Sequence, residues 1–300
     1  MNELTAAGIT DPDLRASYEE CKRLNSMHGK TYFLATLLLP KAKRPFVHAL
    51  YGFARYADEI VDDLASVLTL EQKRQSLSTW GENVLADLQR GTSDDAIGRA
   101  LVDTVIRFNI PHEYFKAFLH SMTMDLSITE YETFEDLTEY VYGSAAVIGL
   151  EMAPILGFSD SAALESAKTL GIAFQLANFI RDVGEDLDRG RIYLPIQELA
   201  QHGVTRAMLQ RRVLTPEIIS ALKFQIARVR ELQAQATPGI ALLDASSRPC
   251  INAASELYCG IVDEVEKIGY DIFNKRASTS TSRRIKVAGA AFLKRLFLSN

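Results

Sequence analysis

The sequence predicts an all-α protein, and three observations lead to this prediction. Residues that start helices recur along the chain, whereas the alternation of apolar and polar residues that marks strands is scarce. Helix breakers are few, with 17 Gly and 9 Pro in 300 residues. No repeat and no Gly/Ser-rich linker divides the chain. We therefore expect a single domain, residues 1–300, in which helices pack as a bundle.

The expected helices are inferred from start signals and from the apolar periodicity between them. Proline stands where a first helical turn tolerates it at Pro12, Pro216 and Pro249. Thr69 and Thr133 begin sequences that resemble capping boxes. The expected helical segments are residues 12–27, 31–39, 44–64, 70–90, 95–108, 112–126, 134–157, 161–187, 216–236 and 249–274. Segments 134–157 and 161–187 are apolar on nearly every face, as is typical of buried central helices.

Composition and charge exclude several classes of protein. The formal net charge is −5 and basic residues are not interleaved with aromatic ones, so nucleic acid is not expected as a partner. Cys21, Cys250 and Cys259 lack C-x-x-C spacing, which indicates a reducing compartment and no zinc site. The first residues resemble no secretory signal, and the longest apolar stretch, about residues 145–158, is too short to cross a membrane. We expect a soluble, cytoplasmic protein.

A first acidic cluster lies on the expected helix 44–64. Tyr51, Arg55, Asp58 and Asp62 are spaced by four, three and four residues, so they share one helix face. Two carboxylates four residues apart repel each other, which costs a few tenths of a kcal/mol on an isolated helix. A cation bound between them would reverse the sign of this interaction.

A second cluster lies on the expected helix 161–187. Asn178, Asp182 and Asp186 form one stripe, with Gln175 and Arg181 beside it. Oxygen ligands without His or Cys suit Mg²⁺, which binds through one or two carboxylates and substrate phosphate; Mn²⁺ is the alternative ion. A di-iron bundle would need Glu-x-x-His pairs, and none of the 5 histidines has a Glu three residues before it.

Each cluster taken alone could be a solvated helix face, and that alternative stays open for either one. Taken together, and each with an arginine, two facing acidic helices would hold a diphosphate through bridging Mg²⁺. Loss of diphosphate from an allylic carbon leaves a carbocation, which needs a dry cavity with apolar and aromatic walls. The aromatic residues that the expected bundle offers are Phe33, Phe53, Tyr140, Phe174 and Phe179.

Longer motifs resemble the phytoene/squalene synthase family of head-to-head prenyl transferases, over about residues 20–276. They are residues 28–33, 51–62 and 140–149, the long and specific stretch QLANFIRDVGEDLDRGRIYLP at 175–195, and Tyr258 with 270–276, which resemble that family's closing helix. The resemblance implies an all-α isoprenoid-synthase fold with a central cavity between two Asp-rich helices. It also implies a two-step reaction through a cyclopropylcarbinyl diphosphate.

The resemblance further implies roles for individual residues. Asp58 and Asp62 would bind Mg²⁺ at one diphosphate, and Asn178, Asp182 and Asp186 would bind it at the other. The tyrosines would hold phosphate or face the cation. The resemblance also implies that Arg55 and Tyr140 are catalytic, together with the four aspartates. The residues that it places at the substrate are His28, Lys30, Thr31, Tyr51, Arg55, Gln175, Arg181, Tyr193, Tyr258 and Arg276.

Some of these assignments have alternatives. From the residues alone, the tyrosines could be ordinary core aromatics, and His28 and Lys30 could close a helix or a loop. The family more often has Ser where this chain has Gly29 and Thr31, and Val-Ala-Gly where it has residues 144–146.

The expected product is phytoene, made from two geranylgeranyl diphosphates in carotenoid biosynthesis. No NADPH is expected, because this reaction ends in the loss of a proton. The alternatives are a squalene or dehydrosqualene synthase using two farnesyl diphosphates and, more distantly, a non-catalytic assembly or lipid-binding member. The small residues that would leave depth for a C20 tail are Ala35, Thr36, Ala145, Ala146 and Gly149.

The C-terminal residues 283–298 mix basic and apolar side chains. We predict that they form an amphipathic segment at the inner face of an anionic membrane. The alternative is a final helix that packs on the bundle.

Overall fold

The computed structural model describes residues 2–62 and 68–298, and describes side chains for all of these except Lys30, Thr31, Asp62 and residues 292–298. Helices make up nearly all of the regular structure in this part of the chain, which confirms the all-α prediction. Two isolated β-bridges, between Glu130 and Ile192 and between Phe158 and Leu243, are the only β pairings within the described ranges.

The described residues form a succession of helices. In chain order they are α1 (Glu3–Ala6), α2 (Pro12–His28), α3 (Lys30–Thr36), α4 (Arg44–Asp62), α5 (Leu70–Arg90), α6 (Ala96–Phe108), α7 (His112–Met124), α8 (Phe134–Val141), the π-helical turn η1 (Tyr142–Ala146), α9 (Val147–Leu156), α10 (Ala162–Asp188), α11 (Ile196–Gln201), α12 (Arg206–Arg211), α13 (Pro216–Ala236), the 3₁₀ turn η2 (Thr237–Leu242), α14 (Arg248–Cys259), α15 (Ile261–Lys267) and α16 (Thr281–Leu298).

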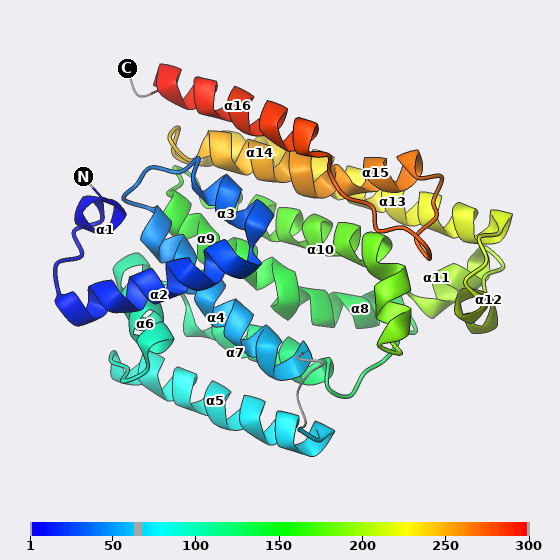
Figure 1. The fold of residues 1–300 in the computed structure, drawn as a ribbon, viewed down its shortest axis with the longest axis horizontal. Coiled ribbons are helices and arrows are strands. Elements are labelled where there is room, and N and C mark those ends of the chain that lie inside the picture. The colour runs from blue at the N-terminus through cyan, green and yellow to red at the C-terminus, as the bar shows by residue number, and fades with distance from the viewer. Residues whose placement is uncertain (1, 63–67, 299–300) are drawn as a thin grey trace.

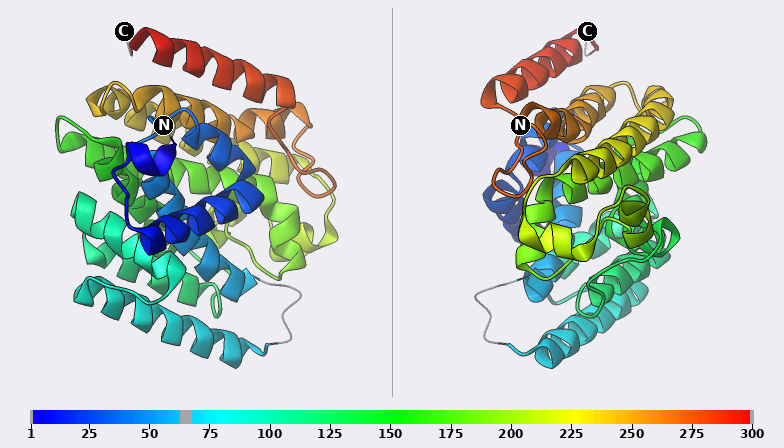
Figure 2. Two further views of the ribbon diagram at one scale, coloured as in Figure 1. Left: turned by 60° about the vertical axis from the view of Figure 1, so that its left-hand side comes forward. Right: turned by 90° about the vertical axis from the view of Figure 1, so that its right-hand side faces the viewer.

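Helix α10 is the centre of the bundle (Figure 1). It contacts η1 and α9 on one side and α13, α14 and α15 on the other. The N-terminal helices α2, α4 and α6 pack on one another beside it, and α5 and α16 lie at opposite edges of the molecule (Figure 2). A long helix in this position can present different faces to several neighbours at once.

Two clusters of buried side chains form the core. One joins α2, α4, α6 and α7 around Tyr18, Phe53 and Phe115. The other surrounds α10 and α13 and includes Ile180 and Leu222. Helix α4 directs Phe53 into the first cluster, so the opposite face of this helix, which carries the acidic motif, is left to line a cavity.

The segment 134–157 is helical as expected, but a π-helical turn, η1, interrupts it. Here the backbone runs close to α7: a Cβ on Gly143 would lie only 2.1 Å from the carbonyl oxygen of Ala117. The hydroxyl of Ser121 donates a hydrogen bond to the Tyr140 carbonyl, at 2.8 Å. The wider turn and the glycine together bring α7 and η1 into contact.

The prediction of one helix over residues 249–274 is wrong in detail. The helix is interrupted at Gly260, between α14 and α15, and α15 ends at Lys267. Gly269 and Tyr270 then adopt φ values of 69° and 63°, which a right-handed helix does not allow. Residues 270–276, expected as part of a closing helix, therefore form turns and irregular chain.

Residues 281–298 form helix α16, which lies along α14 on the outside of the bundle (Figure 2). Val287 is buried, whereas Ile285 is 68% exposed. Within residues 2–62 and 68–298, no helix combines the length and the apolar character needed to cross a membrane. Contact with a membrane surface stays a prediction.

Glu151 on α9 is a buried acid without a partner. It is 0% exposed, and neither carboxylate oxygen has a hydrogen-bond partner among the described residues. Burial raises the pKa of Glu151 well above its ordinary value of 4.5. The folded protein then holds a proton that the unfolded chain releases above pH 4.5, so this residue makes folding less favourable as the pH rises.

We expect Glu151→Met to stabilise the fold by about 1–3 kcal/mol at pH 8, because it removes a buried unpaired acid. The gain should shrink toward pH 5, where the unfolded chain also begins to bind the proton. Urea unfolding at both pH values measures it, with the exposed Glu165→Met on α10 as the control. A loss of stability, or a gain independent of pH, would contradict the interpretation.

Candidate active site

The two acidic clusters line one cavity. Its volume is about 390 Å³, and α4 and α10 form opposite walls of it. Helix α4 contributes Arg55 and Asp58, and α10 contributes Asn178, Asp182 and Asp186. The structure thus brings these residues together, although they come from distant parts of the sequence.

On the α4 wall, an arginine lies between two acids. Arg55 Nη1 donates to Asp58 Oδ2 at 2.8 Å, and Arg55 Nε donates to Glu59 Oε1 at 3.1 Å. His28 Nε2 lies 4.0 Å from Glu59, and His28 does not line the cavity. The predicted roles of Lys30, Thr31 and Asp62 rest on side chains outside the described ones.

On the α10 wall, two arginines meet one aspartate. Arg181 Nε donates to Asp182 Oδ1 at 2.7 Å, and Arg276 Nε donates to the same oxygen at 3.1 Å. Arg276 also pairs with Glu185 at 3.2 Å. Burial, together with the charge of Asp182 one turn earlier, raises the pKa of Asp186 to about 7.

The donors on these walls fit a divalent cation. Asn178 Oδ1 is buried and has no hydrogen-bond partner among the described residues, so it offers an unused oxygen ligand. The raised pKa of Asp186 shows that burial and the neighbouring carboxylate outweigh the positive charges nearby. Within the described ranges, no three His, Cys, Asp or Glu side chains cluster closely enough to hold a metal on their own. Such a sparse set suits an ion that takes further oxygens from phosphate and water.

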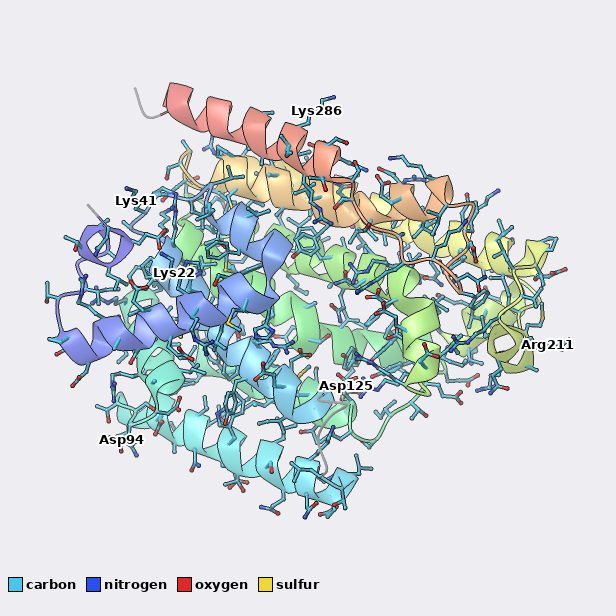
Figure 3. The ribbon with its side chains drawn as sticks, in the orientation of Figure 1. Lys22, Lys41, Asp94, Asp125, Arg211 and Lys286 are labelled. Carbon is cyan, nitrogen blue, oxygen red and sulfur yellow. The ribbon has the colours of Figure 1, made fainter. Side chains whose placement is uncertain are left out.

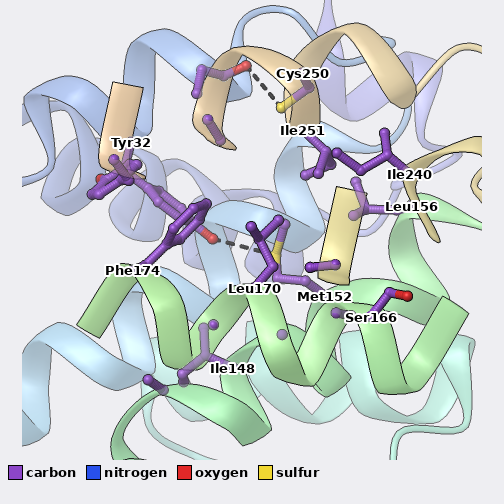
Figure 4. A pocket seen from close by; sticks show the side chains of 18 of the residues that line it. Tyr32, Ile148, Met152, Leu156, Ser166, Leu170, Phe174, Ile240, Cys250 and Ile251 are labelled. Carbon is purple, nitrogen blue, oxygen red and sulfur yellow. Dashed lines mark hydrogen bonds between the residues drawn. The ribbon is translucent and has the colours of Figure 1, made fainter. Parts of the chain in front are cut away.

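A second cavity, of about 420 Å³, is almost entirely apolar (Figure 4). Its walls come from α3, η1, α9, α10, η2 and α14, with Ile148, Leu170 and Phe174 among the lining residues. The residues that line both cavities are Tyr51, Ser144, Gln175 and Asn178. The apolar cavity, called the tunnel below, therefore adjoins the charged cavity, and these four residues border both.

Four of the five small residues named from the sequence line this tunnel, namely Ala35, Thr36, Ala145 and Gly149, whereas Ala146 is fully buried and does not. Gly149 is also required for packing, since a Cβ there would lie 2.2 Å from the carbonyl oxygen of Ala167 on α10. Small residues at these places both widen the tunnel and let α9 approach α10.

The aromatic residues divide between the cavities and the core. Tyr258 lies in the tunnel and stacks on Phe174, with ring centroids 4.9 Å apart. Tyr140, Phe179 and Tyr193 line the charged cavity. Phe53 and Phe33, which were expected near the cation, line neither cavity: Phe53 stacks on Trp80 in the core, and Phe33 stacks on His48.

The sequence reasoning missed three charged residues of this cavity, which are Asp125, Arg189 and Arg191. The two arginines lie within the motif at 175–195, so closer attention to its basic residues could have found them. Asp125 is the C-cap of α7 and carried no spacing signal. Asp125 becomes part of the site only because segments far apart in the chain pack together.

Comparison with known proteins agrees with this geometry. The sequence model of the squalene/phytoene synthase family matches residues 26–283. The chain belongs to this family. It is 36% identical over 293 residues to a 15-cis-phytoene synthase of Synechococcus elongatus, an alignment that covers 94% of each chain. It is 37% identical over 283 residues to a phytoene synthase of Arthrospira platensis, covering 90% of each.

Among solved structures, a dehydrosqualene synthase in complex with a ligand has a similar fold. The TM-score is 0.85 at 26% sequence identity, and the match covers 96% of this chain and 98% of the other. The predicted isoprenoid-synthase fold is thus confirmed. The member of the squalene/phytoene synthase family described here is a prenyl transferase, as predicted from the sequence, and the phytoene-synthase type predicted for it is confirmed by its relatives. The family acts on prenyl diphosphates and generally depends on a divalent metal ion.

We expect Asp182→Asn to reduce turnover of prenyl diphosphate by at least about 100-fold. The substitution keeps the shape of the side chain but removes a charge that faces α4 across the cavity. Steady-state assays measure the loss, and circular dichroism checks that the helices are retained. The matched control is Glu165→Gln, an exposed acid on the same helix, which should leave the activity unchanged. Near-normal activity of Asp182→Asn would refute a role in the reaction.

Proposed function

We propose that the chain condenses two molecules of geranylgeranyl diphosphate head to head to phytoene, in carotenoid biosynthesis. The observation that carries this proposal is that the charged cavity and the apolar tunnel lie next to each other and share four lining residues. A diphosphate and a long hydrocarbon tail need these two environments side by side. In the first step one diphosphate leaves, the double bond of the second molecule attacks, and a proton is lost as the cyclopropane closes. In the second step the remaining diphosphate leaves, and the rearranged cation loses a proton.

We further propose Mg²⁺ as the ion, with Mn²⁺ as the alternative. Asp58 would hold it on α4, with Asp62 as predicted from the sequence, and Asn178, Asp182 and Asp186 would hold it on α10. When bound, the ion supplies positive charge that stabilises the departing diphosphate.

The arginines supply the remaining positive charge. Arg55 and Arg181 are paired with Asp58 and Asp182 on the two walls. A diphosphate entering between the walls offers oxygens to the same guanidinium groups, and Arg276 is close enough to Asp182 to join them. The guanidinium groups can thus exchange a carboxylate partner for a phosphate partner, and the carboxylates that they release would bind the metal ion.

The tunnel limits the access of water to the cation, which forms beside the departing diphosphate at the charged end of the site. Its apolar walls exclude water, which would otherwise capture the carbocation as an alcohol. The small residues Ala35, Thr36, Ala145 and Gly149 support a C20 substrate rather than a C15 one. Since the last step releases a proton, the proposed reaction needs no NADPH.

The substrate is tested with purified protein, Mg²⁺ and either C20 or C15 diphosphate, without NADPH. We expect a C40 hydrocarbon from the C20 substrate, identified by chromatography and mass. A C30 product from the C15 diphosphate, with no C40 product, would overturn the phytoene proposal in favour of dehydrosqualene. No diphosphate release from either substrate by a folded protein would favour a non-catalytic role.

We also propose a cytoplasmic protein that touches the inner face of the membrane through residues 283–298. Ile285 is exposed, and Lys286 points outward from α16 (Figure 3). Basic and apolar residues on an outer helix suit an anionic lipid surface.

We expect Ile285→Ser with Lys286→Glu to weaken binding to vesicles that contain anionic lipid, with activity on detergent-dispersed substrate unchanged. Sedimentation with vesicles measures binding, and neutral vesicles serve as the control. Unchanged binding of this variant and of a chain lacking residues 283–300 would remove the proposal.

A further inference from the structure

Asp125 connects two tyrosines of the charged cavity. The hydroxyl of Tyr140 donates to Asp125 Oδ2 at 2.7 Å, and the hydroxyl of Tyr193 donates to Asp125 Oδ1 at 2.8 Å. Each carboxylate oxygen thus accepts one phenol. Tyr140 comes from α8 and Tyr193 from the segment after α10, while Asp125 ends α7 (Figure 3). One side chain therefore joins three separate parts of the bundle at the cavity.

The backbone of Asp125 is held as well. Arg191 Nη2 donates to the Asp125 carbonyl oxygen at 2.9 Å, and Arg191 Nη1 lies 3.4 Å from the Tyr193 hydroxyl. Because the carboxylate and its own carbonyl are both engaged, the position of Asp125 is determined on two sides. The same contacts leave little freedom for the two phenol groups that depend on it.

The rings of these tyrosines form an aromatic wall. Tyr193 is stacked on Phe179, with centroids 4.3 Å apart and planes inclined by 7°. The Tyr140 ring lies 5.5 Å from that of Tyr193 and 6.1 Å from that of Phe179. All three rings line the charged cavity. Because both phenols are anchored at their hydroxyls, their O–H groups are not free to turn toward an occupant of the cavity.

The anchoring has two physical effects. A phenol O–H that is donated to a carboxylate is not available to donate to a diphosphate oxygen. A hydrogen bond to an anion also increases the electron density of the ring, which strengthens its attraction for a cation. Burial and the charge of Asp125 raise the pKa of both Tyr140 and Tyr193, so both phenols keep their protons.

We propose that Asp125 is a positioning residue for the condensation. It holds Tyr140 and Tyr193 by their hydroxyls so that their electron-rich rings stabilise the carbocation, and it acts through these two phenols although it lines the same cavity. The inference rests on the proposed function, because it requires a carbocation formed from a prenyl diphosphate. It goes beyond that function by assigning different roles to the site tyrosines: Tyr140 and Tyr193 stabilise the cation and do not bind the phosphate.

The central variant is Asp125→Asn, which keeps the shape of the side chain. An amide has one oxygen, so one phenol loses its acceptor and meets an N–H group instead. We expect kcat to fall about 10- to 30-fold, which corresponds to the loss of one strong cation–π contribution. The KM for prenyl diphosphate and the Mg²⁺ concentration that gives half-maximal activity should stay within about twofold. Glu139→Gln, an exposed acid next to Tyr140, is the matched control.

A second set of variants separates positioning from general support of the fold. If Asp125 acts through the two phenols, adding Asp125→Asn to the double variant Tyr140→Phe with Tyr193→Phe should cause no further loss of kcat. A purely structural role would lower the activity of both backgrounds by the same factor. The temperature of half-unfolding of each variant is measured alongside.

Three results would overturn the role of Asp125. They are an unchanged kcat for Asp125→Asn, a rise in KM or in the Mg²⁺ requirement in place of a fall in kcat, and an additive loss in the triple variant. The assays use whichever prenyl diphosphate the wild type turns over. A wild type that uses only the C15 substrate would therefore contradict the proposed substrate and leave the test of Asp125 fully readable.

Discussion

Negative charge held on the walls of a partly open cavity is the constraint to which the rest of the structure is adapted. Carboxylates removed from water are costly unless a positive charge compensates them. Helix α4 meets this need with Arg55 beside Asp58, and α10 meets it with Arg181 beside Asp182. At Asp186 the effect of burial is larger than that of the nearby positive charges, and its pKa is raised. The cavity thus balances most of its own charge and is prepared to receive a metal ion and a diphosphate.

Helix α10 contributes to both environments of the site. Leu170, in the first half of the helix, lines the apolar tunnel, and Asp186, near its end, lines the charged cavity. These residues are separated by about 24 Å along the helix axis. A single helix thereby sets the distance between the place for the diphosphate and the place for the tail. The close approach of α9 and η1 to α10 depends on Gly149 and Gly171, where a side chain would collide with backbone.

The four predicted site tyrosines occupy different positions in the structure. Tyr51 lies at the boundary of both cavities and Tyr258 in the tunnel, whereas Tyr140 and Tyr193 share one carboxylate, that of Asp125. The motifs predicted all four as site residues but not which group each would meet. Hydroxyl partners separate tyrosines that are indistinguishable in the sequence.

The features that could be predicted from the sequence are those that depend on the regular pitch of a helix. The helical segments, the common face of Arg55 and Asp58 and the stripe from Asn178 to Asp186 involve only residues near one another in the chain. The opposition of these two faces, the place of Asp125 in the site and the departure of the chain from a helical path after Lys267 emerged only in three dimensions. They arise from packing between distant segments and from positive φ angles, which local spacing does not encode.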